Sequence, residues 1–282
     1  MLFSKSRPAE GAMLTPSELF SVQGRTALVT GGATGLGRIC AEALLSAGAR
    51  VLIASRKAEA CEQAAHELAA LGPCEGFGGT VASEAGVAAL AAETRRRTGA
   101  LHILVNNAGA GWGEPFETYP WKAWERVMSV NVVGLFGLTR DLAPMLAASA
   151  SVERPSTVIN MGSVMGTVTQ SEFNSAYSAS KAAVHHLTRI LAAEFAPRQI
   201  TVNALAPGPF PTNMNRFALG SDEGLARGAS AVPMGRVGRP DDIAGPLLFL
   251  TGRGGAYTTG AILPVDGGYS VTAPPAMFGD KE

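Results

Sequence analysis

The sequence predicts an α/β fold: a single Rossmann-like, doubly wound parallel sheet with helices on both faces. Short apolar runs alternate along the chain with longer segments of helical pattern, and a glycine-rich turn joins the first run to the first helix. The chain has 282 residues, of which 46% are hydrophobic and 16% charged, with 34 glycines. This composition is typical of a tightly turned globular protein. Strands that alternate with helices of this length indicate βαβ units and hence a parallel sheet.

The predicted elements follow one another without a linker, a repeat or a low-complexity block. We expect residues 1–16 to form a loose N-terminal extension and residues 17–282 to form a single domain. Residues 207–232 are expected to be irregular. The predicted strands are 25–30, 49–54, 76–81 (a weak pattern), 102–106, 157–161, 200–204 and 261–265, and the predicted helices are 36–47, 58–71, 84–98, 121–148, 175–196 and 240–250.

Charge and hydropathy argue against several classes of partner. The chain has 23 basic and 23 acidic residues, so nothing implies nucleic acid or an anionic membrane as the main partner. No apolar run reaches the roughly 18 residues that span a bilayer, and residues 1–12 lack the apolar stretch of a signal peptide. The three cysteines are an odd number without metal-type spacing. We therefore expect reduced thiols, a cytoplasmic protein and no metal ion.

The glycine-rich turn that follows the first predicted strand has the spacing G-x-x-x-G-x-G. Glycines permit a tight turn and close approach of backbone to a pyrophosphate, and the following helix N-terminus offers free N–H groups. Its position between a strand and a helix disfavours an ordinary glycine-rich turn. The dinucleotide contacts expected here are Gly31, Thr34, Gly35, Leu36 and Gly37.

The end of the second predicted strand indicates which dinucleotide is bound. A carboxylate at this point would hold the ribose 2′-hydroxyl of NAD, whereas an arginine accommodates the 2′-phosphate of NADP. The chain reads Ser55-Arg56-Lys57, with no acid before Glu59. The planar fork of Arg56 suits a phosphate, so the sequence favours NADP(H), with Ser55, Arg56 and Lys57 as the expected cofactor contacts. A surface arginine at a helix start is the alternative.

Tyr177 and Lys181 lie four residues apart in one predicted helix, which places both side chains on one face. A nearby ammonium favours the phenolate, so we expect Lys181 to lower the pKa of Tyr177 and the two to act as an acid/base pair. The spacing alone also occurs by chance in many helices. Its meaning depends on the motifs around it.

Taken together, the motifs identify a resemblance to the short-chain dehydrogenase/reductase family. They are the glycine turn, Asn106-Asn107-Ala108-Gly109, Asn131, Ser163, Tyr177-x-x-x-Lys181, and Pro207-Gly208 with Thr212, in family order between Thr30 and Gly268. The resemblance implies a sheet of about seven strands, hydride transfer to or from a nicotinamide, and a homotetramer.

The resemblance also implies four catalytic residues. Tyr177 would be the general acid in reduction, and Lys181 would lower its pKa and hold the nicotinamide ribose. Ser163 would hydrogen-bond the substrate oxygen, and Asn131 would position a water that relays protons to Lys181. Taken singly, Ser163 could be a strand-end turn residue and Asn131 a satisfied buried amide.

Further cofactor contacts follow from the same resemblance. Asn107, Ala108 and Gly109 would pass along the cofactor, while Pro207, Gly208 and Thr212 would meet the nicotinamide carboxamide. The chain departs from the family near the end of the third strand, where the usual aspartate is absent. We expect Thr80, Val81 or their backbone to contact the adenine instead.

Within the family the chain is most similar to 3-oxoacyl reductases of the rhamnolipid-synthesis type, for example in Pro233-Met234-Gly235-Arg236. This implies NADPH-dependent reduction of a 3-oxoacyl thioester or a similar apolar β-keto substrate. Phe210, Met214 and Phe217 of a substrate lid, with Met165 and Phe173, would form an apolar pocket.

Arg154 and Arg198 correspond by position to arginines that dock an acyl carrier protein, although both could be solvated loop residues. A secondary-alcohol dehydrogenase acting on a sugar, polyol, steroid or small aryl ketone is the main alternative function. A nonenzymatic NADPH-binding protein is a third, which the presence of all four catalytic residues disfavours.

Overall fold

The computed structural model describes residues 13–169 and 173–271. Most of the expected N-terminal extension, residues 1–12, lies outside the described residues. Residues 13–15 lead into a short helix, α1 (Pro16–Phe20), which begins with a capping box between Thr15 and Glu18. Among the described residues, no helix combines the length and the hydropathy that a membrane span requires.

Seven parallel strands form one sheet in the order β3-β2-β1-β4-β5-β6-β7, which confirms the predicted fold class. From β1 the sheet extends to one side through β2 and β3, and to the other side through β4, β5, β6 and β7. The strand order therefore reverses between β1 and β4. The strands are β1 (Thr26–Thr30), β2 (Arg50–Ser55), β3 (Cys74–Gly78), β4 (Ile103–Asn106), β5 (Ser156–Met161), β6 (Ile200–Pro207) and β7 (Ile262–Val265).

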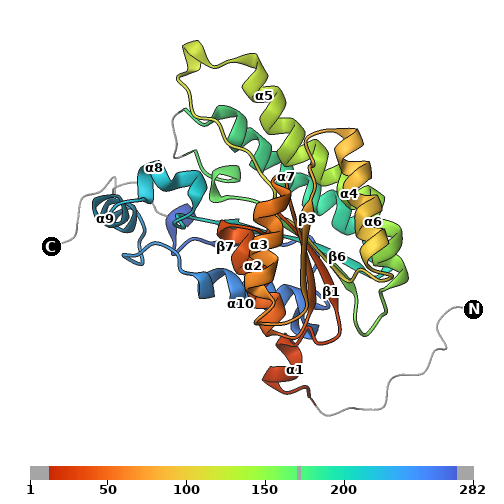
Figure 1. The fold of residues 1–282 in the computed structure, drawn as a ribbon. Helices are drawn as coiled ribbons and strands as arrows, with labels where there is room; N and C mark the ends of the chain where they lie inside the picture. The colour runs from red at the N-terminus through yellow and green to blue at the C-terminus, as the bar shows by residue number, and fades with distance from the viewer. Residues whose placement is uncertain (1–12, 170–172, 272–282) are drawn as a thin grey trace, which may run out of the picture.

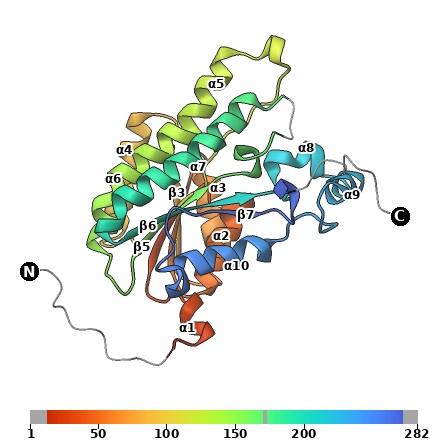
Figure 2. The same ribbon diagram turned by 180° about the vertical axis from the view of Figure 1, so that it is seen from behind.

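The helices cover the sheet in two layers, as Figures 1 and 2 show. Helices α2, α3 and α10 pack on one face, and α4, α6 and α7 pack on the other. The main helices are α2 (Gly35–Ser46), α3 (Ala58–Leu68), α4 (Glu84–Arg97), α5 (Trp121–Met128), α6 (Leu135–Ala148), α7 (Ser175–Phe195), α8 (Arg216–Leu219), α9 (Asp222–Ser230) and α10 (Pro240–Thr251).

Each strand feeds both layers because successive side chains point to opposite faces. Val29 of β1 packs with the α2 layer, whereas its neighbour Leu28 packs with the α4 layer. Ile53 and Leu52 of β2 divide in the same way. This explains why the strands read as continuous apolar runs in the sequence, since both of their faces are buried.

Two predicted segments differ from the observed structure. Residues 121–148 form not one α-helix but α5 and α6, joined by a π-helical segment, η2 (Ser129–Gly134). Gly134 allows this segment to approach the loop after β3, because a Cβ there would lie 2.0 Å from the Val81 carbonyl oxygen. The stretch 207–232, expected to be irregular, contains α8 and α9.

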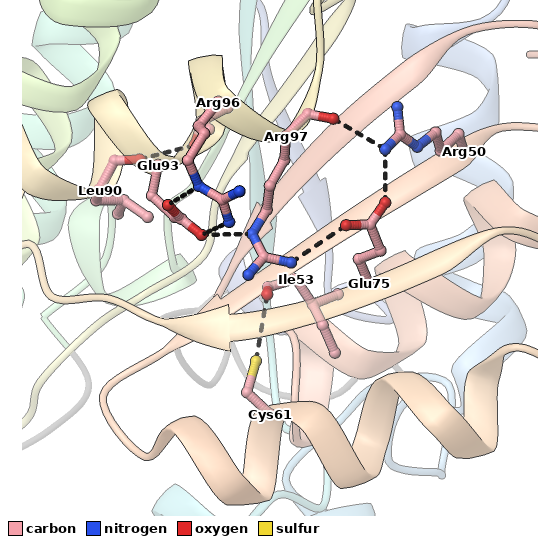
Figure 3. A network of polar contacts seen from close by, with 9 residues as sticks. Arg50, Ile53, Cys61, Glu75, Leu90, Glu93, Arg96 and Arg97 are labelled. Atoms are coloured by element: carbon pink, nitrogen blue, oxygen red, sulfur yellow. Dashed lines mark hydrogen bonds and ion pairs between the residues drawn. The ribbon is translucent and has the colours of Figure 1, made fainter.

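The edge strand β3 is fastened to its neighbours by an exposed charge network (Figure 3). Glu75 pairs with Arg50 of β2 at 2.5 Å and with Arg97 of α4 at 3.1 Å. Arg97 also pairs with Glu93 at 2.7 Å and stacks over the Phe77 ring, 4.6 Å from its centroid. The network ties β3 to β2 and to α4. The three cysteines are free thiols, as expected.

Candidate active site

A cavity of about 960 Å³ runs along the carboxyl ends of the strands. Its walls include residues at the ends of β1, β2, β4, β5 and β6. It therefore crosses the point between β1 and β4 where the strand order reverses, which is where open α/β sheets bind ligands.

Most of the residues predicted from sequence meet in this cavity. Those that line it are Gly31, Thr34, Gly35, Leu36, Ser55, Arg56, Thr80, Val81, Asn107, Ala108, Gly109, Ser163, Tyr177, Lys181, Pro207, Gly208 and Thr212. Gly37, Lys57 and Asn131 lie outside its lining.

The glycine turn after β1 and the loop after β4 hold each other in place. The Asn107 side-chain amide donates to the Thr30 and Gly31 carbonyls at 2.9 and 3.3 Å. Gly31 and Gly35 have φ of +67° and +57°, values that glycine adopts readily. Gly37 serves packing, because a Cβ there would lie 2.3 Å from the Gly31 carbonyl oxygen.

Helix α2 begins at Gly35, and its N-cap residue, Thr34, makes no side-chain cap. As in any α-helix, the N–H groups of its first turn have no intrahelical partner, and here they meet the cavity without a side-chain cap from Thr34. Together with the tight glycine turn, this forms a cradle that fits the pyrophosphate of a dinucleotide.

The charge of the cavity is wholly basic. Among the described residues that line it, the charged side chains are Arg56, Arg126 and Lys181, and none is a carboxylate. Arg56 lies at the end of β2, where the sequence predicted a 2′-phosphate contact. Lys57 is instead the N-cap residue of α3. A polyanionic ligand fits this cavity better than a cationic one.

Ser163, Tyr177 and Lys181 come together from two elements, the end of β5 and the first two turns of α7. The Ser163 side chain hydrogen-bonds that of Tyr177. The Lys181 ammonium donates to the Met161 carbonyl at 2.7 Å and lies 5.5 Å from the centroid of the Tyr177 ring. The structure thus places a phenol, a hydroxyl and an ammonium around one end of the cavity.

The pKa of Tyr177 moves opposite to the direction expected from sequence. Burial raises the pKa of the phenol, and the hydrogen bond with Ser163 acts against that rise. The Lys181 ammonium is itself only 5% exposed, and burial lowers its pKa to about 8. The phenol is consequently protonated at neutral pH and holds a proton that it can donate.

Asn131 lies behind the cavity wall, 2% exposed, in the π-helical segment. Its side-chain oxygen accepts from the Ala110 N–H at 2.7 Å. Its amide nitrogen donates to the Ala110 carbonyl and to the Ser180 hydroxyl, each at 2.9 Å. The side chain therefore ties the loop after β4 to α7 beside Lys181. The sequence did not predict a role for Ser180, because no motif indicates that Asn131 is its hydrogen-bond partner.

The cavity lining includes residues that the sequence had left unassigned. One of them is Arg126 of α5. In the sequence Arg126 is indistinguishable from any solvated helical cation. Another is Gly111, which lies close to Tyr177 and Met214. A Cβ at Gly111 would lie 3.7 Å from Tyr177 Cδ2 and 4.0 Å from Met214 Sδ.

The wall beyond Tyr177 is largely apolar. Trp112, Met165 and Phe210 line it together with Met214 and Phe217, the last two being 53% and 92% exposed. Phe173, expected in the same pocket, is 53% exposed and lies outside the lining. Met214 and Phe217 lie in and beside α8, one of the two helices that the sequence pattern did not reveal.

The expected carrier-docking arginines lie far from this cavity within the chain. Arg154 precedes β5 and donates to the Ser21 and Gln23 carbonyls, at the amino ends of the strands. Arg198 follows α7, whose 21 residues span about 30 Å from the turn that carries Tyr177. Both arginines therefore lie at the opposite edge of the sheet from the chain's own cavity.

Comparisons with known proteins find relatives that match most of the chain. A family model described as Enoyl-(Acyl carrier protein) reductase matches residues 31–270. The rhamnolipids biosynthesis 3-oxoacyl-[acyl-carrier-protein] reductase of Pseudomonas aeruginosa is 46% identical over 250 residues, 89% of this chain and 98% of that protein. Galactitol 2-dehydrogenase (L-tagatose-forming) of Cereibacter sphaeroides is 40% identical over 255 residues, 90% of this chain and 98% of that protein.

A solved structure extends the likeness to three dimensions. The Pseudomonas aeruginosa RhlG/NADP active-site complex has a TM-score of 0.87 and 45% sequence identity, covering 90% of this chain and 99% of its own. The family match, the relatives and the sheet order agree. The chain belongs to the short-chain dehydrogenase/reductase family of oxidoreductases.

Proposed function

We propose that this chain is an NADPH-dependent carbonyl reductase whose substrate is a 3-oxoacyl thioester or a similar apolar β-keto compound. The observation that carries the proposal is a single cavity that joins a basic, carboxylate-free end to an apolar end through Ser163, Tyr177 and Lys181. A polyanionic cofactor fits the first end, and an acyl chain fits the second.

The cofactor is NADP(H), and residues along the whole basic end would hold it. The turn from Gly31 to Leu36 would bind the pyrophosphate, and Arg56 with Ser55 would bind the 2′-phosphate. Bound NADPH supplies the hydride. The remaining contacts that we propose are Thr80 and Val81 at the adenine, Asn107, Ala108 and Gly109 along the ribose, Lys181 at the nicotinamide ribose, and Pro207, Gly208 and Thr212 at the carboxamide.

The protein's own part in the reaction is to handle a proton and a developing negative charge. Tyr177, protonated at neutral pH, would donate its proton to the substrate carbonyl oxygen. Ser163 would donate a hydrogen bond to the same oxygen as charge accumulates there. Lys181, with a pKa of about 8, would return a proton toward the phenolate, and Asn131 would hold the water that relays protons to Lys181.

The apolar wall supports an acyl substrate. Trp112, Met165 and Met214 lie around the Tyr177 end of the cavity, and Phe217 at the rim is 92% exposed. Such a wall buries the methylene groups of an acyl chain favourably. The 3-oxoacyl activity in the name of the Pseudomonas relative adds support.

A secondary-alcohol dehydrogenase acting on a sugar or polyol is the second candidate. One relative is a galactitol dehydrogenase, and Asn174, Asn213 and Tyr269 contribute amide and phenol groups to the cavity wall. These polar groups could bind hydroxyls on a substrate if the apolar wall were not the dominant surface.

Oxidation of NADPH separates the two candidates. We expect turnover of acetoacetyl and longer 3-oxoacyl thioesters, with kcat/KM rising with chain length, and little oxidation of polyols with NADP⁺. The same acyl groups on coenzyme A and on an acyl carrier protein would show which thioester is preferred. Absence of turnover on every thioester, beside rapid reduction of simple ketones, would contradict the proposal.

A further inference from the structure

A buried histidine that the reaction does not use lies directly beneath Ser163. His185 is 5% exposed and is carried by α7, one turn after Lys181. Its ring faces the short 3₁₀ turn η3 (Val164–Gly166), which follows Ser163 at the end of β5. The Ser163 hydroxyl accepts from the Met165 N–H at 3.2 Å, so this turn sets the orientation of the hydroxyl.

The two ring nitrogens of His185 meet the two ends of that turn. Nε2 accepts from the Ser163 N–H at 3.5 Å. Nδ1 lies 3.5 Å from the Thr167 hydroxyl oxygen. An N–H donor at Ser163 requires an unprotonated Nε2, so the neutral ring carries its proton on Nδ1, which then donates to Thr167.

Two glycines make room for the ring. A Cβ at Gly162 would lie 2.4 Å from His185 Nε2, and a Cβ at Gly166 would lie 2.7 Å from His185 Cε1. At both positions the turn approaches the imidazole too closely for any side chain. The ring and the turn are therefore packed as one unit, which fixes the distance between β5 and α7 at the active site.

We propose that His185 is a positioning residue: a neutral imidazole that locks the Ser163 turn to α7, so that Ser163 and Tyr177 reach the same substrate oxygen. The inference rests on the proposed function for Ser163 and Tyr177. It assigns His185 no contact with substrate or cofactor. Burial and the nearby Lys181 and Arg189 cations lower the pKa of the ring to about 4, which keeps it neutral in the working range.

Two substitutions separate positioning from simple packing. His185→Leu keeps a similar volume but removes both nitrogens, and we expect kcat to fall by roughly 10- to 100-fold. His185→Gln restores an acceptor near Ser163, and we expect it to recover most of that loss. The affinity for NADPH, measured by fluorescence titration, should change less than about twofold in both variants. His186→Leu, the same change at the exposed neighbour, is the matched control and should behave as the wild type.

The outcomes are distinguishable. Unchanged kcat in His185→Leu would overturn the proposal, and so would equal losses in the Leu and Gln variants. Ring ¹⁵N chemical shifts of the wild type at neutral pH give a readout that needs no turnover, and we expect the Nδ1–H tautomer. A protonated ring or the opposite tautomer would contradict the inference. If the wild type reduced no carbonyl compound, the proposed function would be contradicted. The tautomer of His185 would still test its contact with Ser163 in that case.

Discussion

Two cations are buried at opposite edges of the sheet, and the protein holds them differently. Arg25, 4% exposed, lies at the amino edge just before β1, and Lys181, 5% exposed, lies at the carboxyl edge. Arg25 donates to the carbonyls of Thr251, His102 and Pro155 at 2.9, 3.2 and 2.6 Å. Lys181 donates to one carbonyl, that of Met161. Arg25 therefore ties several elements together, whereas Lys181 is bonded to the end of β5.

Burial lowers the pKa of both cations, but the consequences differ. It lowers the pKa of Arg25 to about 10, so the guanidinium stays charged at neutral pH. It lowers the pKa of Lys181 to about 8, so the ammonium exchanges protons in the working range. A guanidinium with several fixed donors suits structure, and an ammonium that titrates readily suits chemistry. The comparison predicts that substitutions at the amino edge lower the stability of the protein, whereas substitutions at the carboxyl edge lower its activity.

The largest expected effect concerns the carboxyl edge. Tyr177→Phe should lower kcat by roughly 10³-fold, because it removes the proton donor. The free energy of unfolding should change by less than about 1 kcal/mol, because one hydrogen bond with Ser163 is lost. Steady-state NADPH oxidation and urea unfolding measure the two effects. Tyr257→Phe, at a fully exposed tyrosine, is the control. Undiminished reduction by Tyr177→Phe would show that the edge is not catalytic as proposed.

Replacement of each buried cation by methionine should separate the edges by stability. Arg25→Met should lower the free energy of unfolding by about 3 kcal/mol, because the carbonyls it clamps lose their partner. Lys181→Met should raise it by about 1 kcal/mol, because a desolvated charge is removed at the cost of one hydrogen bond. Urea unfolding at pH 7.5 checks both values. Equal destabilisation by the two substitutions would abolish the distinction.

The pH dependence of stability sharpens the same comparison. The folded-state pKa of Lys181 is about 8, below its ordinary value of 10.5, so between these values the unfolded chain binds a proton that the native chain does not. Stability attributable to this residue therefore rises with pH in that window. The stability of the wild type relative to Lys181→Met should therefore rise by roughly 1.5 kcal/mol from pH 8 to 9.5, so that the advantage of the variant disappears at the higher pH. A gap that stayed constant would place the pKa of Lys181 elsewhere.

A third cation, Arg56, lies in the cavity and should affect neither stability nor proton transfer. Arg56→Asp should weaken NADPH binding by roughly 10- to 100-fold, since one charge-assisted contact is lost, and should leave NADH binding little changed. Lys57→Asp makes the same charge change one residue away, outside the cavity lining, and is the matched control. Fluorescence titration with both cofactors gives the ratio. An unchanged NADPH preference would refute the role proposed for Arg56.

The smallest effect is expected at the exposed network on the β3 edge (Figure 3). Glu75→Gln breaks its pairs with Arg50 and Arg97, whose side chains are 37% and 22% exposed. Because such pairs are screened by solvent, the loss should be below about 1 kcal/mol and should shrink with added salt. Thermal unfolding at low and high salt measures it. A loss as large as that of Arg25→Met would mean that burial is not what makes a cation essential.

The sequence was enough to predict the sheet and most element bounds, and most of the site residues predicted from it line the cavity. The glycine turn, Ser163 and the Tyr177–Lys181 spacing each sit at a strand end or on one helix face, so a short stretch of sequence carries the information. The two short helices α8 and α9 were missed, because their stretch, rich in glycine, proline and polar residues, resembles a loop. The π-helical segment was missed because residues 121–148 keep one continuous helical pattern; its close approach to Val81 at Gly134 joins positions far apart in the sequence.

The remaining differences come from burial and from direction in space. The pKa of Tyr177 was expected to fall because Lys181 is near, but desolvation, which no spacing reveals, raises it. Arg154 and Arg198 align with a docking pair, yet they lie at the amino edge, away from the chain's own cavity. Arg126 and His185 became meaningful only when the fold brought them to the cavity and to the Ser163 turn.

The most direct test of the account is the turnover of one 3-oxoacyl thioester by the paired methionine variants, expressed per folded molecule. The account predicts that Lys181→Met is folded, at least as stable as the wild type, and nearly inactive. It predicts that Arg25→Met is less stable but turns over at close to the wild-type rate. Retained activity in Lys181→Met, or loss of activity in folded Arg25→Met, would contradict the division of the sheet into a structural edge and a chemical edge.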